Sequence, residues 1–240
     1  DGIAQSYFEY LKIPYTHSGV VSSMNSMNKV ISKQIFKKCN ILSPKYAVIN
    51  IHQANPKKIK ETLKKNKLKL PVVLKPINEG SSIGVKICKN LDQLNIYSKE
   101  LTKKYKTLIV EQFINGQEIQ VAVINKKALG AIELKPKRQF YDYKAKYFKS
   151  AKTKHVMPAN INRKKYLEVL KIAEKTHKSL NCRGVTRSDF KFYKNKFYLL
   201  EINTQPGMTN LSLVPEIAKY SGISFDKLVK KILLDASLLR

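Results

Sequence analysis

The stretch from residue 185 to residue 203 constrains the fold more than any other part of the chain. Two runs, Val185–Phe192 and Phe197–Asn203, alternate apolar and polar side chains with the period of a β-strand. The polar residues 194–196 lie between them, which predicts a β-hairpin with a three-residue loop over these positions. One face of this hairpin is apolar and is expected to join a core: Ser188, Phe190 and Phe192 on the first strand, and Tyr198, Leu200 and Ile202 on the second.

The predicted register gathers charged and amide side chains on the other face. Asp189 lies opposite Glu201, and Arg187 lies opposite Asn203. Two directly opposed carboxylates repel each other in a plain sheet, and a bound divalent cation removes that repulsion. Carboxylate and amide oxygens are hard ligands suited to Mg²⁺ shared with phosphates. A solvated strand face with unrelated charges is the alternative interpretation.

The rest of the chain shows helical stripes mixed with short strands, so we expect an α+β fold. The antiparallel or mixed sheets form two lobes that meet near residue 110. Helices are expected over residues 3–12, 25–38 (capped by Ser23 or Asn25), 56–66, 91–105, 163–180, 213–220 and 225–234. Further strands are expected over 46–51, 71–75, 107–111, 118–124 and 127–134, the last two joined at Asn125-Lys126.

Two loops have compositions typical of binding sites. Lys75 ends an apolar strand, where its charge costs desolvation unless it meets an anion, and a Gly/Ser loop over residues 78–84 follows it. This loop contains neither a Walker motif nor GxGxxG, so an ordinary turn is the alternative. Residues 204–212 form a turn-rich loop that leads into a helix, and backbone N–H groups there can bind anionic oxygens. Residues 135–157 lack a clean period, which is typical of a functional loop or of disorder.

The charge balance invites a nucleic-acid interpretation, which the residue types weaken. The 240 residues carry a formal net charge of +29. The segment Lys135–Lys154 combines basic and aromatic residues, as a single-strand binding surface does. Only five of the 46 Lys+Arg residues are Arg, however, whereas readers of bases and phosphates rely on Arg forks. A lysine-rich solvated surface is therefore preferred, and a basic nucleic-acid-binding protein stays an alternative.

Cysteine usage and hydropathy indicate a cytoplasmic protein. Cys39, Cys88 and Cys182 lie far apart without CxxC spacing, which is typical of reduced thiols. No apolar run approaches the roughly 18 residues of a membrane span. Residues 1–5 lack the basic region of a secretory signal and look like the middle of a longer protein.

Several motifs, in order along nearly the whole chain, resemble the ATP-grasp superfamily and, within it, the D-alanine–D-alanine ligase family. Asp1-Gly2 and residues 13–19 resemble the end of that family's N-terminal domain. The other motifs are Met27-Asn28-Lys29, Val73–Pro76 with Glu79–Val85, Val110–Ile114 through Glu118, Phe140–Tyr147, Arg187–Asp189, and Glu201–Thr209 with Ser212–Pro215. The resemblance implies a remnant of the N-terminal domain over residues 1–18, a central lobe over 19–110, and a C-terminal lobe over 111–240 whose catalytic lid is 135–157. The two lobes of this fold sandwich the nucleotide.

The resemblance also implies roles for single residues. Lys29 and Lys75 would bind the ATP phosphates, and the loop with Ser81 and Ser82 would close over them. Glu111 would contact adenine and Glu118 the ribose. Asp189, Glu201 and Asn203 would hold two Mg²⁺ (or Mn²⁺) ions. Three groups of catalytic residues are implied: Lys146 at the γ-phosphate, Arg187 and the backbone N–H of Gly207 at the oxyanion, and Ser81 with Tyr147 on the substrate side. Ser212 and Tyr143 would contact substrate.

The implied reaction joins two D-alanine molecules through an acyl phosphate, for peptidoglycan precursor synthesis. ATP and D-alanine would be the partners, with neither nucleic acid nor membrane, and a homodimer is compatible with the resemblance. Most of the family's N-terminal lobe, which holds the first substrate, has no counterpart among the 240 residues. A truncated relative that only binds nucleotide, and an ATP-grasp ligase for another acid or amine, are therefore alternatives.

Overall fold

The chain forms two compact units, and one of them combines residues from both ends of the sequence. The computed structural model describes residues 1–50, 55–136, 153–209 and 212–239. One unit combines residues 1–42 with 116–240, and the other is residues 43–115. The expected boundaries differ from this division, because residues 19–42 group with the C-terminal residues rather than with the central lobe. Helix α2 (Val20–Met27) contacts β9 (Lys196–Asn203), and α3 (Lys29–Lys38) contacts α7 (Arg163–Ser179).

The unit of residues 43–115 is a four-stranded antiparallel sheet with two helices. Its strands lie in the order β1 (Tyr46–Asn50), β4 (Thr107–Gln112), β2 (Val72–Pro76) and β3 (Lys86–Cys88). Helices α4 (Pro56–Lys65) and α5 (Leu91–Thr102) pack on the apolar side chains of this sheet. Strand β3 was not predicted, because three residues are too few to show an alternation.

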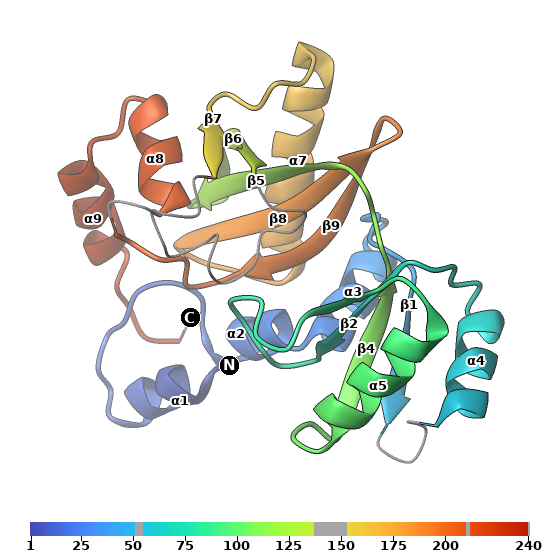
Figure 1. Ribbon diagram of the computed structural model, residues 1–240. Helices are drawn as coiled ribbons and strands as arrows, with labels where there is room; N and C mark the ends of the chain where they lie inside the picture. Colours follow the sequence, from blue (N-terminus) through green and yellow to red (C-terminus); the bar gives the residue numbers. More distant parts are fainter. Residues whose placement is uncertain (51–54, 137–152, 210–211, 240) are drawn as a thin grey trace. The chain divides into compact units, whose positions relative to one another are not determined.

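The larger unit is built on a five-stranded antiparallel sheet with a helix layer on each face (Figure 1). The strand order is β7 (Lys154–Val156), β6 (Lys127–Lys135), β5 (Gln117–Ile124), β8 (Val185–Tyr193) and β9. On β5, Ile119, Val121 and Val123 face the cluster that includes α7. Ala122 and Ile124 face the opposite cluster, formed with α8 (Leu213–Tyr220) and α9 (Phe225–Leu234). Strand β7, also three residues long, was not predicted.

The helix predicted over residues 25–38 is two helices, and the expected cap is wrong. Helix α2 ends at Met27, and α3 begins at Lys29. Between them Asn28 has extended backbone angles (φ −79°, ψ 105°), and its side chain accepts hydrogen bonds from the N–H groups of Val30 and Ile31. Asn28 is therefore the N-cap of α3, as expected of an Asn whose side-chain oxygen satisfies free N–H groups. This break places Lys29 in the first turn of α3.

The hairpin of β8 and β9 has the two predicted cross-strand pairs but a different turn. Arg187 pairs with Asn203, and Asp189 pairs with Glu201, as predicted. The turn has two residues, Lys194 and Asn195, with φ values of 45° and 62°. Positive φ at both positions is the type I′ geometry that matches the twist of paired strands.

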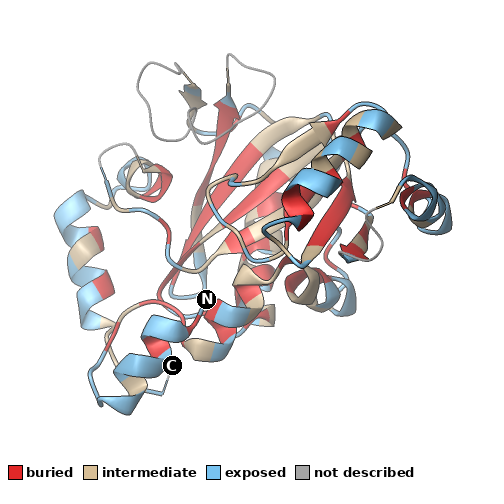
Figure 2. Cartoon of the chain, turned by 60° about the horizontal axis from the view of Figure 1, so that its bottom comes forward, coloured by how far each residue is buried: buried red, intermediate tan, exposed pale blue. Residues whose placement is uncertain are grey.

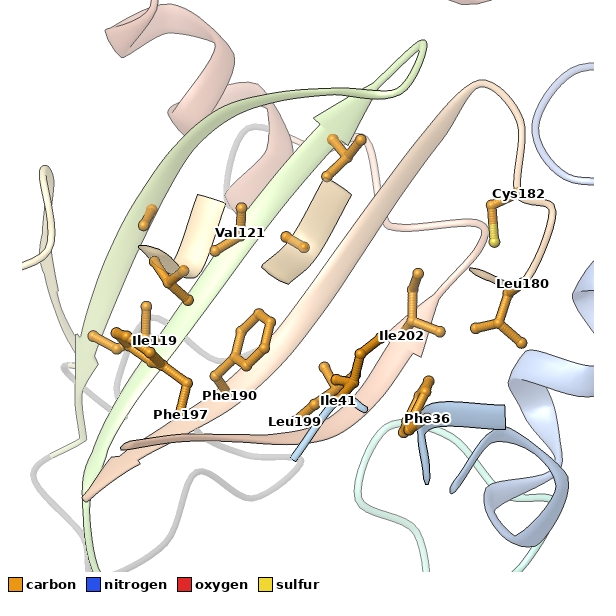
Figure 3. Packing of buried hydrophobic residues seen from close by; sticks show 14 of the residues in the cluster. Phe36, Ile41, Ile119, Val121, Leu180, Cys182, Phe190, Phe197, Leu199 and Ile202 are labelled. Atoms are coloured by element: carbon orange, nitrogen blue, oxygen red, sulfur yellow. The ribbon is translucent and has the colours of Figure 1, made fainter. Parts of the chain in front are cut away.

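A β-bulge between Asp189 and Phe190 reconciles this shorter turn with the predicted pairs. Beyond the bulge the register shifts by one, so that Phe190 pairs with Leu199. The shift exchanges the two faces of the second strand: Leu199 and Phe197 are buried in the core with Phe190 (Figure 3). The prediction that Tyr198 and Leu200 form the core is wrong, because an extra residue in one strand reverses the alternation on one side of the bulge.

The other predicted helices and strands are present with small differences at their ends, including α1 (Ile3–Tyr10) and the β5–β6 hairpin. Its turn residues Asn125 and Lys126 both have positive φ. Buried residues concentrate in the strands and on the inward sides of the helices (Figure 2). Across the described ranges, no helix has both the length and the apolar character needed to span a membrane.

Candidate active site

The polar face of the larger sheet carries four of the predicted residues in two cross-strand rows. One row contains Asp189 and Glu201 on neighbouring strands, and the next contains Arg187 and Asn203. Residues directly opposite each other in an antiparallel pair share a face. The alternation and the bulge therefore bring together four residues that the sequence placed on one surface.

Arg187 and Asp189 form a tight ion pair within strand β8. The Arg187 Nε lies 2.8 Å from Asp189 Oδ1, and Nη2 lies 3.0 Å from Oδ2. Both side chains are largely buried, at 15% and 7% exposure. This two-point contact fixes the plane of the guanidinium and neutralises Asp189.

Glu201 and Asn203 also have partners. Lys29 Nζ lies 3.8 Å from Glu201 Oε2, so the first turn of α3 reaches the sheet face. Asn203 Oδ1 accepts a hydrogen bond from the N–H of Gln205 at 2.9 Å, which shapes the start of the following loop. Each of the two opposed carboxylates thus has a cationic side chain within ion-pairing distance, Arg187 closely and Lys29 at the limit.

The donor set fits a hard divalent cation. Among the described residues no group of three or more His, Cys, Asp or Glu side chains could hold a metal ion. Asp189 and Glu201 instead combine two carboxylates with the amide of Asn203, and oxygen donors of this kind suit Mg²⁺ or Mn²⁺. An ion bound there would compete with Arg187 and Lys29 for the carboxylate oxygens.

Further along the same face, Glu118 is paired with a lysine that sequence reasoning missed. Lys191 Nζ lies 3.0 Å from Glu118 Oε2, and the two residues are cross-strand partners on β5 and β8. Lys191 follows Asp189 at the period of two, so the strand alternation was the signal that could have found it.

The loop after β9 holds Gly207 close to Ser212. A Cβ at residue 207 would lie 2.9 Å from Ser212 Oγ, so only glycine fits there without displacing that hydroxyl. Ser212 is the N-cap of α8, but its side chain accepts instead from the N–H of Thr209 at 2.9 Å. The backbone near Gly207 and the Ser212 hydroxyl therefore lie side by side at the start of a helix, where anions are stabilised.

In the unit of residues 43–115, Lys75 and Glu111 form a buried ion pair. Lys75 Nζ lies 2.9 Å from Glu111 Oε2, with side-chain exposures of 9% and 3%. Lys75 was predicted to need an anion at the end of its strand, and Glu111 is that anion here. Burial, and after it the charge of Glu111, raise the pKa of Tyr46, the cross-strand partner of Glu111.

Ser81 and Ser82 lie in a tight turn of the same unit. Both have positive φ, at 50° and 62°, which is a strained backbone region for residues other than glycine. Glu79, at the start of this loop, accepts a hydrogen bond from the Tyr105 hydroxyl at 2.9 Å. The structure thus holds the loop in a defined shape, with both serines half-buried.

Three predicted residues lie outside the described residues: Tyr143, Lys146 and Tyr147. The same holds for most of the predicted lid and of the basic, aromatic segment Lys135–Lys154.

Comparisons with known proteins give one consistent family. Residues 35–234 match the model of the D-ala D-ala ligase C-terminus. A D-alanine–D-alanine ligase of Pelagibacter ubique is 56% identical over all of this chain and 78% of its own length, and one of Geotalea uraniireducens is 43% identical over 99% and 75%.

The crystal structure of the Bacillus anthracis D-alanine–D-alanine ligase superposes with a TM-score of 0.86 at 32% identity, over 98% of this chain and 75% of that one. The predicted α+β ATP-grasp fold is thereby confirmed, with antiparallel sheets in both units. The order of motifs, the acidic hairpin face and these matches lead to one conclusion: the chain belongs to the D-alanine–D-alanine ligase family.

Proposed function

We propose that the chain joins two D-alanine molecules with consumption of ATP, as part of cell-wall precursor synthesis. The observation that carries the proposal is the face with Arg187, Asp189, Glu201 and Asn203, set beside 56% identity to a D-alanine–D-alanine ligase over the whole chain. Use of ATP agrees with the cytoplasmic location expected from the sequence.

The proposed reaction has two steps, phosphoryl transfer and then formation of the peptide bond. A carboxylate oxygen of the first D-alanine attacks the γ-phosphorus of ATP, and ADP leaves. The amine of the second D-alanine attacks the carbonyl carbon of this acyl phosphate, inorganic phosphate leaves, and the amine loses a proton. Both steps depend on positioning and on neutralisation of negative charge.

The residues of the sheet face are suited to these tasks. Asp189, Glu201 and Asn203 would hold the divalent ions, for which two Mg²⁺ or Mn²⁺ are proposed, and these ions would neutralise phosphate charge. Arg187 and the N–H of Gly207 would stabilise the oxyanion of the second step. Ser212 would receive the carboxylate of the second D-alanine, since its hydroxyl lies beside Gly207.

Residues from the rest of the chain are proposed for ATP and for the lid. Lys29 and Lys75 would contact phosphates, and the loop with Ser81 and Ser82 would cover them. Glu111 would contact adenine, and Glu118 would contact the ribose. Lys146, Tyr143 and Tyr147 keep the γ-phosphate and substrate roles expected from the resemblance.

The test is ADP and phosphate release with and without D-alanine, for the wild type and for Glu201→Gln. Release that depends on D-alanine is expected of the wild type, and loss of release is expected of the variant. The melting temperature of the variant should change little, because Glu201 is 32% exposed and Gln keeps the size and the side-chain oxygen of Glu. Full turnover by the variant would refute the metal assignment.

Calorimetric binding of Mg·ATP separates the alternatives. A wild type that binds Mg·ATP but releases no ADP with D-alanine would be a nucleotide-binding relative. Release that requires another amino acid would identify a ligase for a different substrate. Absence of Mg·ATP binding, with retention on heparin at about 0.2 M salt, would instead favour the nucleic-acid alternative.

A further inference from the structure

The row of Asp189 and Glu201 has a third member on strand β5. Gln120 is the cross-strand partner of Asp189, just as Glu201 is on the other side. Directly opposed residues have Cβ atoms about 5 Å apart on the same face. The row across β5, β8 and β9 therefore runs Gln120, Asp189, Glu201, an amide followed by two carboxylates.

Gln120 is buried with its side-chain oxygen unpaired. The residue is 1% exposed, and its Oε1 atom has no hydrogen-bond partner among the described residues. Its partner on β6 is Ile132, fully buried, which offers no donor. A buried acceptor left unpaired is unfavourable, so such an atom in a site calls for a ligand, an ion or a water.

The charged neighbours on this face are already engaged with one another. Glu118 and Lys191 pair one row away, and Arg187 holds both oxygens of Asp189. Gln120 lies between these two ion pairs, beside the carboxylates proposed to hold the divalent ions. A divalent ion held at these carboxylates would bring its own water into this row, next to the unpaired Oε1 of Gln120.

We propose that Gln120 is a positioning residue of the metal site: its side-chain oxygen accepts a hydrogen bond from water held by the divalent ion at Asp189 and Glu201. This inference rests on the proposed function and adds a fourth oxygen-bearing side chain to the set. It also accounts for a polar side chain at a position paired with the apolar Ile132.

The test replaces Gln120 by Met, which has a similar size and no hydrogen-bonding amide. Melting without ligand and calorimetric affinity for ATP, in Mg²⁺ and in EDTA, are measured without D-alanine, so that ATP is not consumed. We expect an unchanged or higher melting temperature, because an unpaired buried group is removed. The affinity for Mg·ATP should fall about 3- to 10-fold, and that for ATP in EDTA should stay the same.

Ser188→Ala is the matched control. Ser188 also has a buried oxygen without a partner in the described part of the chain, but it lies next to Asp189 on the opposite face. This variant should bind Mg·ATP like the wild type. An equal loss of affinity in Ser188→Ala would show that any buried change near Asp189 has this effect, and would overturn the inference.

The remaining outcomes separate the inference from the proposed function. If Gln120→Met binds Mg·ATP as tightly as the wild type, or loses as much affinity for ATP in EDTA as in Mg²⁺, the proposed role of Gln120 is refuted. The proposed function would not be affected by either result. A wild type that does not bind Mg·ATP would refute both. If Gln120→Met does not fold, Gln120→Glu decides: a third carboxylate in the row should tighten binding of Mn²⁺, and unchanged or weaker Mn²⁺ binding would contradict the inference.

Discussion

The buried pair of Lys75 and Glu111 gives the most demanding prediction. Their charged atoms are 2.9 Å apart, and both side chains are almost completely withdrawn from water. Replacing either residue alone, by Lys75→Met or Glu111→Leu, leaves the other charge buried without its partner. Replacing both removes the two charges together.

The magnitude follows from the distance and the burial. At an effective dielectric constant of about 20, two unit charges 2.9 Å apart attract by about 6 kcal/mol. Desolvation of both groups offsets most of this attraction, whereas breaking such a pair from one side costs about 3–5 kcal/mol. We therefore expect each single variant to lose about 3 kcal/mol of unfolding free energy, and the double variant to lie within about 1 kcal/mol of the wild type.

Equilibrium unfolding in urea, monitored by circular dichroism, measures these differences in unfolding free energy. Calorimetry measures ATP binding for the same proteins. The double variant should recover stability but not ATP affinity, because both residues are proposed to contact ATP. Single losses below about 1 kcal/mol that simply add in the double variant would refute the reasoning, since they would show that the two charges do not interact.

Three further predictions concern other parts of the fold. Burial lowers the pKa of His177 from 6.5 to about 4, so the unfolded state binds more protons than the native state below pH 6.5. The unfolding free energy in urea should therefore fall by about 2.5 kcal/mol between pH 7.5 and 4.5, and His177→Gln should flatten this slope. Burial raises the pKa of Cys88 and Cys182 to about 11, so Ellman's reagent at pH 8 should modify only Cys39 in the native protein and all three thiols in urea; rapid native labelling of all three would contradict this. Asn28→Ala should cost about 1 kcal/mol in urea unfolding by removing the cap of α3, whereas Asn28→Asp, which keeps the capping oxygen, should cost little.

The elements with a strong local signal could be predicted from the sequence. Alternation and turn residues located the β5–β6 and β8–β9 hairpins, and apolar stripes located most helices. Strands β3 and β7 were missed because three residues carry no period. The break at Asn28 was missed because residues 20–27 bury serines rather than an apolar stripe, so hydrophobic periodicity marks neither the start nor the end of that helix.

The pairing in the acidic row was predicted correctly, but from a turn that differs from the one in the structure. The pairing of Asp189 with Glu201 was predicted from a three-residue loop, and it arises from a two-residue turn followed by a bulge. Burial of Leu199 rather than Leu200 reveals the difference. A bulge leaves no local mark in the sequence, because it depends on how the partner strand packs.

The sequence by itself determined the kinds of chemistry available: an acidic face on one hairpin, a glycine loop after a buried lysine, and the ordered motifs of one family. The tertiary structure alone decided which groups meet. It paired Lys29 with Glu201 and Lys191 with Glu118, joined residues 1–42 to the C-terminal residues, and placed Gln120 beside Asp189. The physical reason is that these neighbours come from segments far apart along the chain, and packing, which no local period records, brings them together.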